Sequence, residues 1–332
     1  MTTNRGIALV ELDADGVDRA FRADVLAGLR QKHKAVPARW LYDDAGSKLF
    51  EEITGLEEYY PTRAETEILK QRGADFRRLI GCGRAIVEFG SGSSVKTPLL
   101  LSAIEPSAYV PLDISGDFLR QSSAALARKF PDIPVYPVEA DFMREVSLPP
   151  EVGEAKKLGF FPGSTIGNMV ARTAVDLLRS MCATLGGNHG GRPLLLIGMD
   201  LVKDQSVLEA AYDDARGVTA EFNLNLARRI NRELRGTLPV DALAHRAVWN
   251  DEYARIEMHL EAMRDLSFEV AGERFHMAEG ETIHTENSHK FTRRSANLLL
   301  LAGGWTPLER WTDAENRFSL ILAEASEQRN AP

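Results

Sequence analysis

A short segment around residue 90 carries the clearest chemical signal in this sequence. The apolar residues 85–87 are followed by Glu88, Gly90 and Gly92, and the chain then continues into an expected helix. A strand, a glycine loop and a helix in this order predict the edge of an α/β sheet that receives a nucleotide-like ligand. Glycine suits this loop because it has no Cβ, so the backbone turns tightly and comes close to a ligand.

The glycine spacing favours one class of ligand. The dinucleotide fingerprint G-x-G-x-x-G needs a third glycine, and Val95 and Lys96 occupy that neighbourhood here. An acid before the first glycine, here Glu88, instead suits a cationic or hydroxyl-bearing ligand, such as the amino-acid end of S-adenosylmethionine. On this motif alone, a glycine-rich turn without a ligand stays an alternative.

Acidic residues also follow other expected strands. Asp113 ends the strand after the glycine loop, and in doubly wound folds the acid at this place accepts hydrogen bonds from ribose hydroxyls. Asp141 and Phe142 follow a third strand, where a polar group and a ring could receive an adenine. Each acid alone could be a helix cap or a surface carboxylate. Together with the loop they predict a nucleoside-type site.

The elements that position these residues alternate between strand and helix. We expect strands at 85–89, 108–112, 133–138, 157–161 and 194–199, and helices at 96–104, 116–129 and 172–185. This alternation predicts a doubly wound parallel sheet. A helix at 295–301 and strands at 305–311 and 318–323 would add a terminal hairpin. The result would be a seven-stranded sheet with one antiparallel member, as in the seven-stranded methyltransferases.

Two other parts of the chain do not fit the alternation. Residues 16–60 have a helical pattern, and a loop at 59–63 precedes an expected helix at 64–79. After Asp200 come a long helix at 218–234 and strands at 254–263 and 268–277. We therefore expect two domains. Residues 64–200 plus 290–326 would bind the cofactor, and residues 1–63 plus 201–289 would form a substrate-binding α+β domain.

Composition excludes several classes of protein. The net charge of −8 argues against a nucleic-acid-binding surface. Cys82 and Cys182 are far apart, so neither a disulfide framework nor a cysteine zinc site is expected. The pattern H-x-E-x-x-H at 284–289 could suggest a metal, but a strand would put His289 opposite His284, and we expect no metal. No membrane span or secretory signal is evident, so we expect a cytoplasmic monomer that binds neither nucleic acid nor membrane.

Seven segments in a fixed order carry a resemblance to a known family. They are residues 40–50, 58–63, 88–97, 163–168, 200–204, 211–214 and 286–291. The most specific are Tyr-Tyr-Pro-Thr-Arg at 59–63 and Gly-Ser-Thr-Ile-Gly-Asn at 163–168. On these segments the chain resembles the histidine Nα-methyltransferases of ergothioneine biosynthesis (the EgtD family). The resemblance implies an α/β fold, with a seven-stranded Rossmann-like methyltransferase sheet and a second, substrate-binding α+β domain.

The resemblance also implies which residues form the site. The expected S-adenosylmethionine site, to which the loop argument adds Glu88, consists of Tyr59, Glu88, Gly90, Lys96, Asp113, Asp141 and Phe142. The expected substrate site consists of Tyr42, Phe50, Asn168, Tyr212, Thr219, Met258, Glu286 and Ser288. Within it, Asn168 and Tyr212 would hold the substrate carboxylate, and Tyr42 and Asn168 would lie near the reacting amine as the catalytic residues. Met258, Glu286 and Ser288 would line the imidazole pocket.

This assignment is chemically coherent for histidine. A neutral imidazole has one N–H donor and one acceptor nitrogen, so Glu286 can accept from it and Ser288 can donate to it. Residues two apart on an extended segment point to the same side. The implied activity is transfer of three methyl groups to the α-amino group of L-histidine, giving hercynine. The alternatives are methylation of another amino acid such as tryptophan, a nicotinamide-dependent oxidoreductase, and a catalytically silent S-adenosylmethionine-binding protein.

Overall fold

The structure is a computed structural model that describes residues 12–92, 96–114, 116–186 and 191–326. The chain divides into two compact units, here called the sheet unit (residues 61–202 and 290–332) and the inserted unit (residues 1–60 and 203–289). The predicted roles of two domains in binding cofactor and substrate stay a prediction. Residues 93–95 of the glycine motif lie outside the described residues. None of the described helices has the length and apolar composition needed to cross a membrane.

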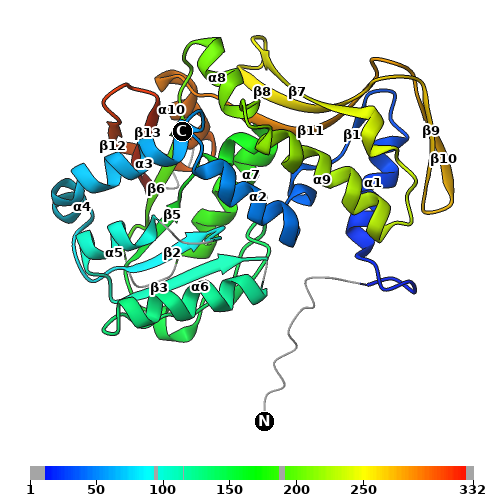
Figure 1. Ribbon diagram of the computed structural model, residues 1–332. Helices are drawn as coiled ribbons and strands as arrows, with labels where there is room; N and C mark the ends of the chain where they lie inside the picture. The colour runs from blue at the N-terminus through cyan, green and yellow to red at the C-terminus, as the bar shows by residue number, and fades with distance from the viewer. Residues whose placement is uncertain (1–11, 93–95, 115, 187–190, 327–332) are drawn as a thin grey trace, which may run out of the picture. The chain divides into compact units, whose positions relative to one another are not determined.

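The sheet unit contains a seven-stranded sheet (Figure 1). Its strand order is β12(Trp305–Thr312), β13(Phe318–Ala325), β6(Leu194–Asp200), β5(Lys157–Phe161), β2(Ala85–Phe89), β3(Ala108–Asp113) and β4(Val138–Glu139). β13 runs antiparallel to both of its neighbours, and β6, β5, β2, β3 and β4 are parallel. The predicted fold, with one antiparallel strand, is therefore confirmed.

Helices cover both faces of this sheet. On one face lie α3(Tyr60–Gln71), α4(Gly73–Ile80), α5(Thr97–Ile104) and α6(Gly116–Lys129). On the other face lie α7(Ala171–Leu185) and α10(Arg293–Ala302). Short 3₁₀ turns occur at η2(Pro150–Val152) and η3(Thr165–Asn168). Because both faces are covered, β2 and β5 are buried along their whole length, which explains why they are mostly apolar, with Glu88 in β2 and Lys157 in β5 as the exceptions.

Three expectations for this part of the chain were wrong in detail. The expected strand at 133–138 shortens to β4, with an isolated bridge at Val135, because Pro134 and Pro137 have no N–H to donate to a ladder. The expected loop at 59–63 is instead largely the first turn of α3, where Pro61 is tolerated because the N–H it lacks has no partner there. The helix expected at 64–79 is interrupted between α3 and α4, just before Gly73.

The inserted unit has its own four-stranded sheet. The strand order is β1(Lys34–Ala35), β11(Thr282–His289), β8(Arg255–Ala262) and β7(Leu243–Asn250), with only the β1–β11 pair parallel. A separate hairpin joins β9(Leu266–Val270) to β10(Glu273–Met277). The helical elements are α1(Arg19–Leu29), η1(Ala38–Leu41), α2(Asp44–Thr54), α8(Gln205–Tyr212), α9(Val218–Glu233) and η4(Val240–Ala242).

Here too the sequence pattern was misleading in two places. Residues 16–60 do not form a continuous helical region, because β1 and Pro37 interrupt it and Asp43 caps a new helix by accepting from the Gly46 N–H at 2.8 Å. The single strand expected at 268–277 is a hairpin, since Ala271 and Gly272 both adopt positive φ angles, 51° and 81°.

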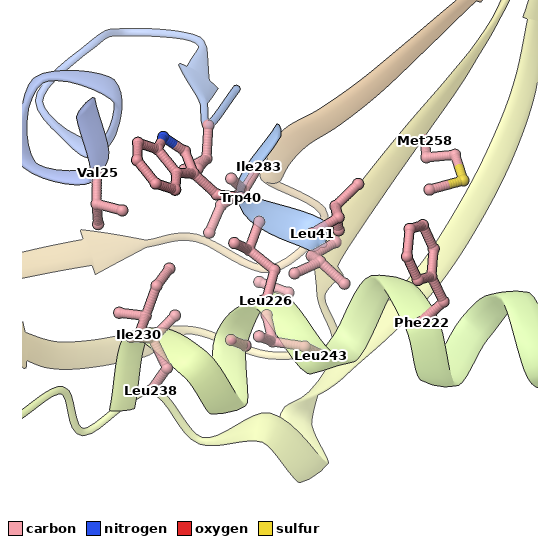
Figure 2. Packing of buried hydrophobic residues seen from close by; sticks show 14 of the residues in the cluster. Val25, Trp40, Leu41, Phe222, Leu226, Ile230, Leu238, Leu243, Met258 and Ile283 are labelled. Carbon is pink, nitrogen blue, oxygen red and sulfur yellow. The ribbon is translucent and has the colours of Figure 1, made fainter. Parts of the chain in front are cut away.

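One apolar core holds the inserted unit together. Residues of α1, η1 and α9 pack with residues of β7, β8 and β11, as Figure 2 shows for Val25, Trp40, Ile230 and their neighbours. Met258 of β8 and Phe222 of α9 lie at one end of the residues shown. The apolar face of α9 thus packs on one face of the sheet, here called the inner face. Side chains that point the other way lie on the outer face.

Candidate functional site

The glycine loop folds over the end of β3 in the sheet unit. The N–H groups of Gly90 and Ser91 both donate to Leu112 O, at 2.9 and 3.0 Å. Gly90 has a φ of 68°, and a Cβ there would lie 3.3 Å from the ring of Phe142. Only glycine therefore allows this path at this distance from the ring.

Acceptor oxygens and an aromatic ring surround this loop. Asp113 Oδ2 accepts from the Gly92 N–H at 3.0 Å, and the exposed Asp141 accepts from the Met143 N–H at 3.0 Å. The Phe142 ring lies 6.2 Å from Phe89 and 6.1 Å from Phe161, measured between ring centroids. Carboxylates beside a glycine loop and an aromatic ring fit the hydroxyls and the base of a nucleoside. The same acids disfavour a pyrophosphate through charge repulsion.

Glu88 lies in β2, just before the glycine loop, and its side chain holds neighbouring elements in place. Its Oε2 accepts hydrogen bonds from Tyr109 Oη at 2.6 Å and from Thr97 Oγ1 at 2.7 Å, and the residue is buried. Thr97 is the first residue of α5, so Glu88 fixes the point at which the helix begins after the loop.

We expect Glu88→Gln to stabilise the protein more at pH 8 than at pH 5. Burial raises the pKa of Glu88 from 4.5 to about 7, although Tyr109 and Thr97 oppose this by hydrogen bonding. The stabilisation that the neutral carboxyl provides is complete below pH 4.5 and is lost as the pH rises through about 7. Such a shift corresponds to about 3 kcal/mol.

Urea unfolding of the ligand-free protein at several pH values measures this effect. The exposed Glu145→Gln is the matched control and should follow the wild type at every pH. If Glu88→Gln and wild type keep the same difference in free energy of unfolding from pH 5 to pH 8, the buried-carboxyl interpretation is wrong.

Glu65 contacts the candidate site and was missed by the sequence interpretation. It is fully buried, forms an ion pair with Lys96, and accepts from the Gly163 N–H with its two oxygens at 3.1 and 3.0 Å. A Cβ at Gly198 of β6 would lie 2.6 Å from Glu65 Oε1, so a glycine makes room for this carboxylate. Glu65 therefore links the expected cofactor residue Lys96 to the loop that follows β5. The sequence did contain a signal for Glu65: it is an acidic residue on the face of α3 that also carries the apolar residues Ala64 and Ile68.

Asn168 lies at the end of that same loop. The loop is held on one side by Glu65 and on the other by Ser164, whose Oγ accepts from the Asp200 N–H at 2.8 Å. Ser164 has a φ of 60°, and η3 then leads to Asn168, which is half-buried. Asn168 thus follows the carboxyl end of β5, on a loop tied to two other parts of the sheet unit.

Five aromatic side chains of the inserted unit form a chain of ring contacts. Four of them were expected site residues, and the fifth is Phe222. Tyr42 makes edge contacts with Phe50 and Phe222, at centroid distances of 5.4 and 5.3 Å. Phe50 lies 6.2 Å from Tyr59, and Tyr59 lies 6.2 Å from Tyr212. Phe222 was not among the expected residues, because an aromatic residue at helical spacing in α9 is indistinguishable from ordinary core.

Polar groups of the expected substrate site meet beside these rings. Tyr212 Oη lies 2.6 Å from Ser288 Oγ, and Glu286 of β11 pairs directly with Met258 of β8. Glu286 is only 7 % exposed. Thr219, at the start of α9, is buried and its N–H donates to Asp214 Oδ1 at 2.7 Å. The inserted unit therefore brings together six of the expected substrate residues, Tyr42, Phe50, Tyr212, Met258, Glu286 and Ser288. Asn168 belongs to the sheet unit.

Tyr42 interacts with the Glu286 carboxylate. The residue as a whole is 37 % exposed, but its hydroxyl hydrogen-bonds to Glu286 and is withdrawn from water. Burial raises the pKa of the Tyr42 phenol well above 10, and the charge of Glu286 raises it further. Tyr42 is therefore a protonated hydrogen-bond donor at neutral pH and a poor general base.

A β-bulge in β11 changes which side chains share a face. The ladder is interrupted between His284 and Glu286, so Thr285 is an extra residue in the strand. The buried positions are Ile283, Thr285, Glu286 and Ser288. His284 and His289 consequently share the less buried outer face, whereas regular alternation had placed them on opposite faces.

The outer face holds three groups that could ligate a metal. Ligand atoms of Glu257, His259 and His284 lie within 4.8 Å of one another. Glu257 Oε1 already accepts from Arg255 at 2.7 Å and from Asn250 at 2.9 Å, and His284 Nε2 lies 3.0 Å from Glu286 O. The absence of a functional metal stays a prediction.

Comparisons with known proteins identify the family to which the sequence is similar. The family model described as histidine-specific methyltransferase, SAM-dependent, matches residues 21–325. The chain is 40 % identical over 318 residues to the histidine N-alpha-methyltransferase of Mycolicibacterium smegmatis, covering 94 % of this chain and 97 % of that protein. It is 38 % identical over 325 residues to the protein of the same name from Mycobacterium tuberculosis, again covering 94 % and 97 %. Ergothioneine biosynthesis protein 1 of Neurospora crassa is 28 % identical over 331 residues, which are 96 % of this chain and 36 % of that protein.

These matches extend over nearly the whole chain and so include both units. The two bacterial relatives are similar in length as well as in sequence, since almost all of each is covered. The resemblance inferred from the sequence segments is thereby confirmed, and so is the dependence on S-adenosylmethionine. The chain belongs to the family of histidine-specific, S-adenosylmethionine-dependent methyltransferases.

Proposed function

We propose that this protein transfers three methyl groups from S-adenosylmethionine to the α-amino group of L-histidine and so forms hercynine in ergothioneine biosynthesis. Family membership and the bacterial relatives support the reaction. The single structural observation that carries the choice of histidine is Glu286. It is a buried carboxylate, with the Ser288 hydroxyl two residues further along the inner face of β11.

The proposed pocket matches the two nitrogens of an imidazole. Glu286 accepts a hydrogen bond from the imidazole N–H, and Ser288 donates one to the other nitrogen. Met258, directly opposite Glu286 in the ladder, limits the size of the ring that fits. Phe50 and Thr219 complete the lining, and the rings around Tyr42 keep water away from the hydrogen bond between the imidazole and the Glu286 carboxylate, which strengthens it.

The Tyr212 and Ser288 hydroxyls share a hydrogen bond that restricts their roles. The pair has two protons, and one of them lies between the two oxygens. When Ser288 donates to the substrate imidazole, Tyr212 donates to Ser288. Tyr212 can bind the substrate carboxylate at the same time only if this bond opens. Histidine binding is therefore expected to separate the two hydroxyls.

For the cofactor we propose the residues around the glycine loop. Gly90 leaves room for the ligand, and Asp113 and Asp141 accept from its hydroxyl groups. Phe142 contacts its base, and Lys96, Glu88 and Tyr59 complete the site. S-adenosylmethionine, once bound, supplies a methyl group that its sulfonium already activates. The sheet unit would thus hold the cofactor, and the inserted unit most of the substrate site.

The remaining task of the protein is to present a neutral amine in the right place. The α-ammonium group must lose a proton before it can react. Tyr42 is a poor acceptor for that proton, because its raised pKa keeps the phenol in its protonated form. Tyr42 therefore orients the amine and Glu286, and solvent receives the proton. Asn168 binds the amino-acid end of the substrate through its amide. Positioning of this kind accounts for much of the rate.

A competition assay tests the proposed function. All common amino acids are offered together with S-adenosylmethionine, and the methylated products are identified by mass. Trimethylated histidine should dominate. Methylation of tryptophan or another amino acid in its place would refute the proposed specificity, and no methylation at all would refute the reaction. Sedimentation of the same sample tests the monomeric state, which we include in the proposal.

We expect Tyr212→Phe to raise KM for histidine and to leave the affinity for S-adenosylmethionine nearly unchanged. The substitution removes the hydroxyl that contacts Ser288 but keeps the ring that packs against Tyr59. Loss of one hydrogen bond to a charged group costs about 1.5–3 kcal/mol, or roughly a ten- to hundred-fold rise in KM. Calorimetry with each ligand separates the two affinities. A collapse of cofactor binding would assign Tyr212 to the cofactor site or to the fold.

A further inference from the structure

A buried asparagine lies on the apolar face of α9. Asn223 is fully buried, and Phe222, Leu226 and Ala227 around it belong to the same core. Asparagine is a weak helix former, and its burial is unfavourable unless its amide is fully hydrogen-bonded. A polar residue in this position therefore requires partners of matching chemistry.

Every polar atom of the Asn223 side chain has such a partner. Nδ2 lies 3.0 Å from His259 O and 2.9 Å from His245 Nδ1, while Oδ1 lies 2.6 Å from Thr285 Oγ1. His245 Nε2 in turn lies 2.8 Å from Tyr212 O. The donors and acceptors match only if His245 is neutral, with its proton on Nε2. Burial lowers the pKa of His245, which favours this neutral form.

Thr285, the partner of Asn223 Oδ1, is the extra residue of the bulge. Counted from the buried Ile283, strict alternation would place Glu286 on the outer face. The bulge places Thr285 and Glu286 both on the inner face, with Glu286 opposite Met258. The Thr285 hydroxyl also lies 3.0 Å from Met258 O.

The bulge is fastened from both faces of the sheet. On the inner face, Thr285 donates to Asn223 of α9. On the outer face, the His284 ring lies 3.0 Å from the backbone oxygen of Glu286 itself. Through Asn223, the same network reaches the backbone of His259 on β8 and, by way of His245, that of Tyr212. One asparagine thus connects the segments that carry Tyr212, Met258 and Glu286.

We propose that Thr285 and Asn223 are positioning residues for substrate recognition: they lock the β11 bulge and thereby hold the Glu286 carboxylate toward the imidazole. The substrate part of this proposal rests on the proposed function. Neither residue needs to touch the substrate, because Thr285 acts through the direction of the next residue in the chain. The side chain of Glu286 has several rotatable bonds, so an unlocked bulge would let its carboxylate occupy many positions.

The test compares Thr285→Val, which removes the hydroxyl at similar volume, with Thr285→Ser, which retains it. Thr237→Val is the matched control, because Thr237 Oγ1 also makes a hydrogen bond within the inserted unit, from the Glu269 N–H at 2.9 Å. Deuterium uptake of the peptide containing residues 283–289 reports on the bulge without any ligand. Calorimetry reports histidine binding in the presence of S-adenosylhomocysteine, and it reports cofactor binding separately.

We expect Thr285→Val to speed deuterium uptake in this peptide and to weaken histidine binding about ten- to hundred-fold. Cofactor affinity should stay within about two-fold of wild type, and Thr285→Ser should restore histidine binding to within about three-fold. Thr237→Val should change neither histidine binding nor uptake at 283–289. Should Thr285→Val fail to fold, Thr285→Cys replaces the hydroxyl by a weaker donor at similar size and is measured in the same way.

A double-mutant cycle separates positioning from general stability. If Thr285 acts through Glu286, Thr285→Val should cause little further loss of histidine binding in a Glu286→Ala background. Equal losses in both backgrounds, or unchanged uptake at 283–289 in Thr285→Val, would overturn the proposal. If the wild type binds no histidine, the proposed function fails instead. In that case the uptake measurement still decides whether Thr285 fastens the bulge.

Discussion

Replacing Glu286 by alanine should lower kcat/KM for histidine by about two orders of magnitude. The Glu286 carboxylate is buried, and we propose that it accepts the imidazole N–H, so its removal leaves that donor without a partner in a water-poor pocket. A lost hydrogen bond to a charged group costs about 3 kcal/mol at the upper end, which corresponds to such a change in rate. A site built to bind a polar group discriminates strongly through this effect.

Steady-state kinetics with histidine measures this loss, and calorimetry with S-adenosylmethionine is the control. Cofactor affinity should be retained, because Glu286 belongs to the inserted unit and the glycine loop to the sheet unit. Glu286→Gln keeps an acceptor oxygen and should lose less activity than Glu286→Ala. Wild-type kcat/KM in Glu286→Ala would make Glu286 a strand carboxylate without a role in recognition, and the choice of histidine would fail.

The same pocket should accept a larger ring when its size and charge are changed together. Met258 stands opposite Glu286 and is buried, so Met258→Val creates space where Glu286→Ala removes charge. We expect the double variant to gain activity on tryptophan relative to histidine. The ratio of the two kcat/KM values in a mixed-substrate assay measures this change of specificity.

Replacing Asp113 by alanine should weaken S-adenosylmethionine binding about ten- to hundred-fold, or about 1–3 kcal/mol. Two effects contribute. The cofactor hydroxyls lose their acceptor, and the Gly92 N–H loses the Asp113 oxygen that now holds the loop at 3.0 Å. Calorimetric titration with S-adenosylmethionine gives the affinity directly. An unchanged Kd would remove Asp113 from the cofactor site.

A second substitution separates these two effects. Asp113→Asn keeps a carbonyl oxygen that can accept from the Gly92 N–H, but it removes the charge offered to the cofactor. If loop anchoring dominates, Asp113→Asn should bind nearly as well as wild type. If hydrogen bonding to the cofactor dominates, it should resemble Asp113→Ala. Asp141→Ala, at an exposed position of the same edge, should have the smaller effect of the two acids.

The sheet unit was largely predictable because strands that are buried on both faces have mostly apolar sequences, which are easy to recognise. β2 and β5 are buried throughout and are mostly apolar, apart from Glu88 in β2 and Lys157 in β5, so each can be recognised as a strand without knowing its neighbours. The exception is β4, where Pro134 and Pro137 interrupt a run that otherwise looks like a strand. The missing N–H groups of these two prolines shorten the strand even though the segment is apolar.

The inserted unit was less predictable because its decisive features are long-range contacts. Asn223 in isolation is a weak helix former, and its role depends on Thr285, which is 62 residues away in the sequence. The bulge contains no glycine that would indicate it in the sequence. The regular alternation of side chains therefore predicted the wrong face for His289 relative to His284. Ala271 likewise gave no sign of a hairpin, since positive φ is uncommon for alanine.

The parallel pairing of β1 with β11 affects how the newly made chain can fold. Lys34 pairs with Ile283 and Ala35 with His284, so the first strand of this sheet cannot find its partner until residue 284 has been synthesised. At about 5–20 residues per second, the roughly 250 intervening residues take about 12 to 50 seconds to make. For that time the apolar residues of α1 and η1, among them Phe21, Trp40 and Leu41, have no β11 to pack against. The inserted unit, which begins first along the chain, is thus completed only when the chain has reached residue 289, and its early segments stay exposed to proteases and chaperones until then.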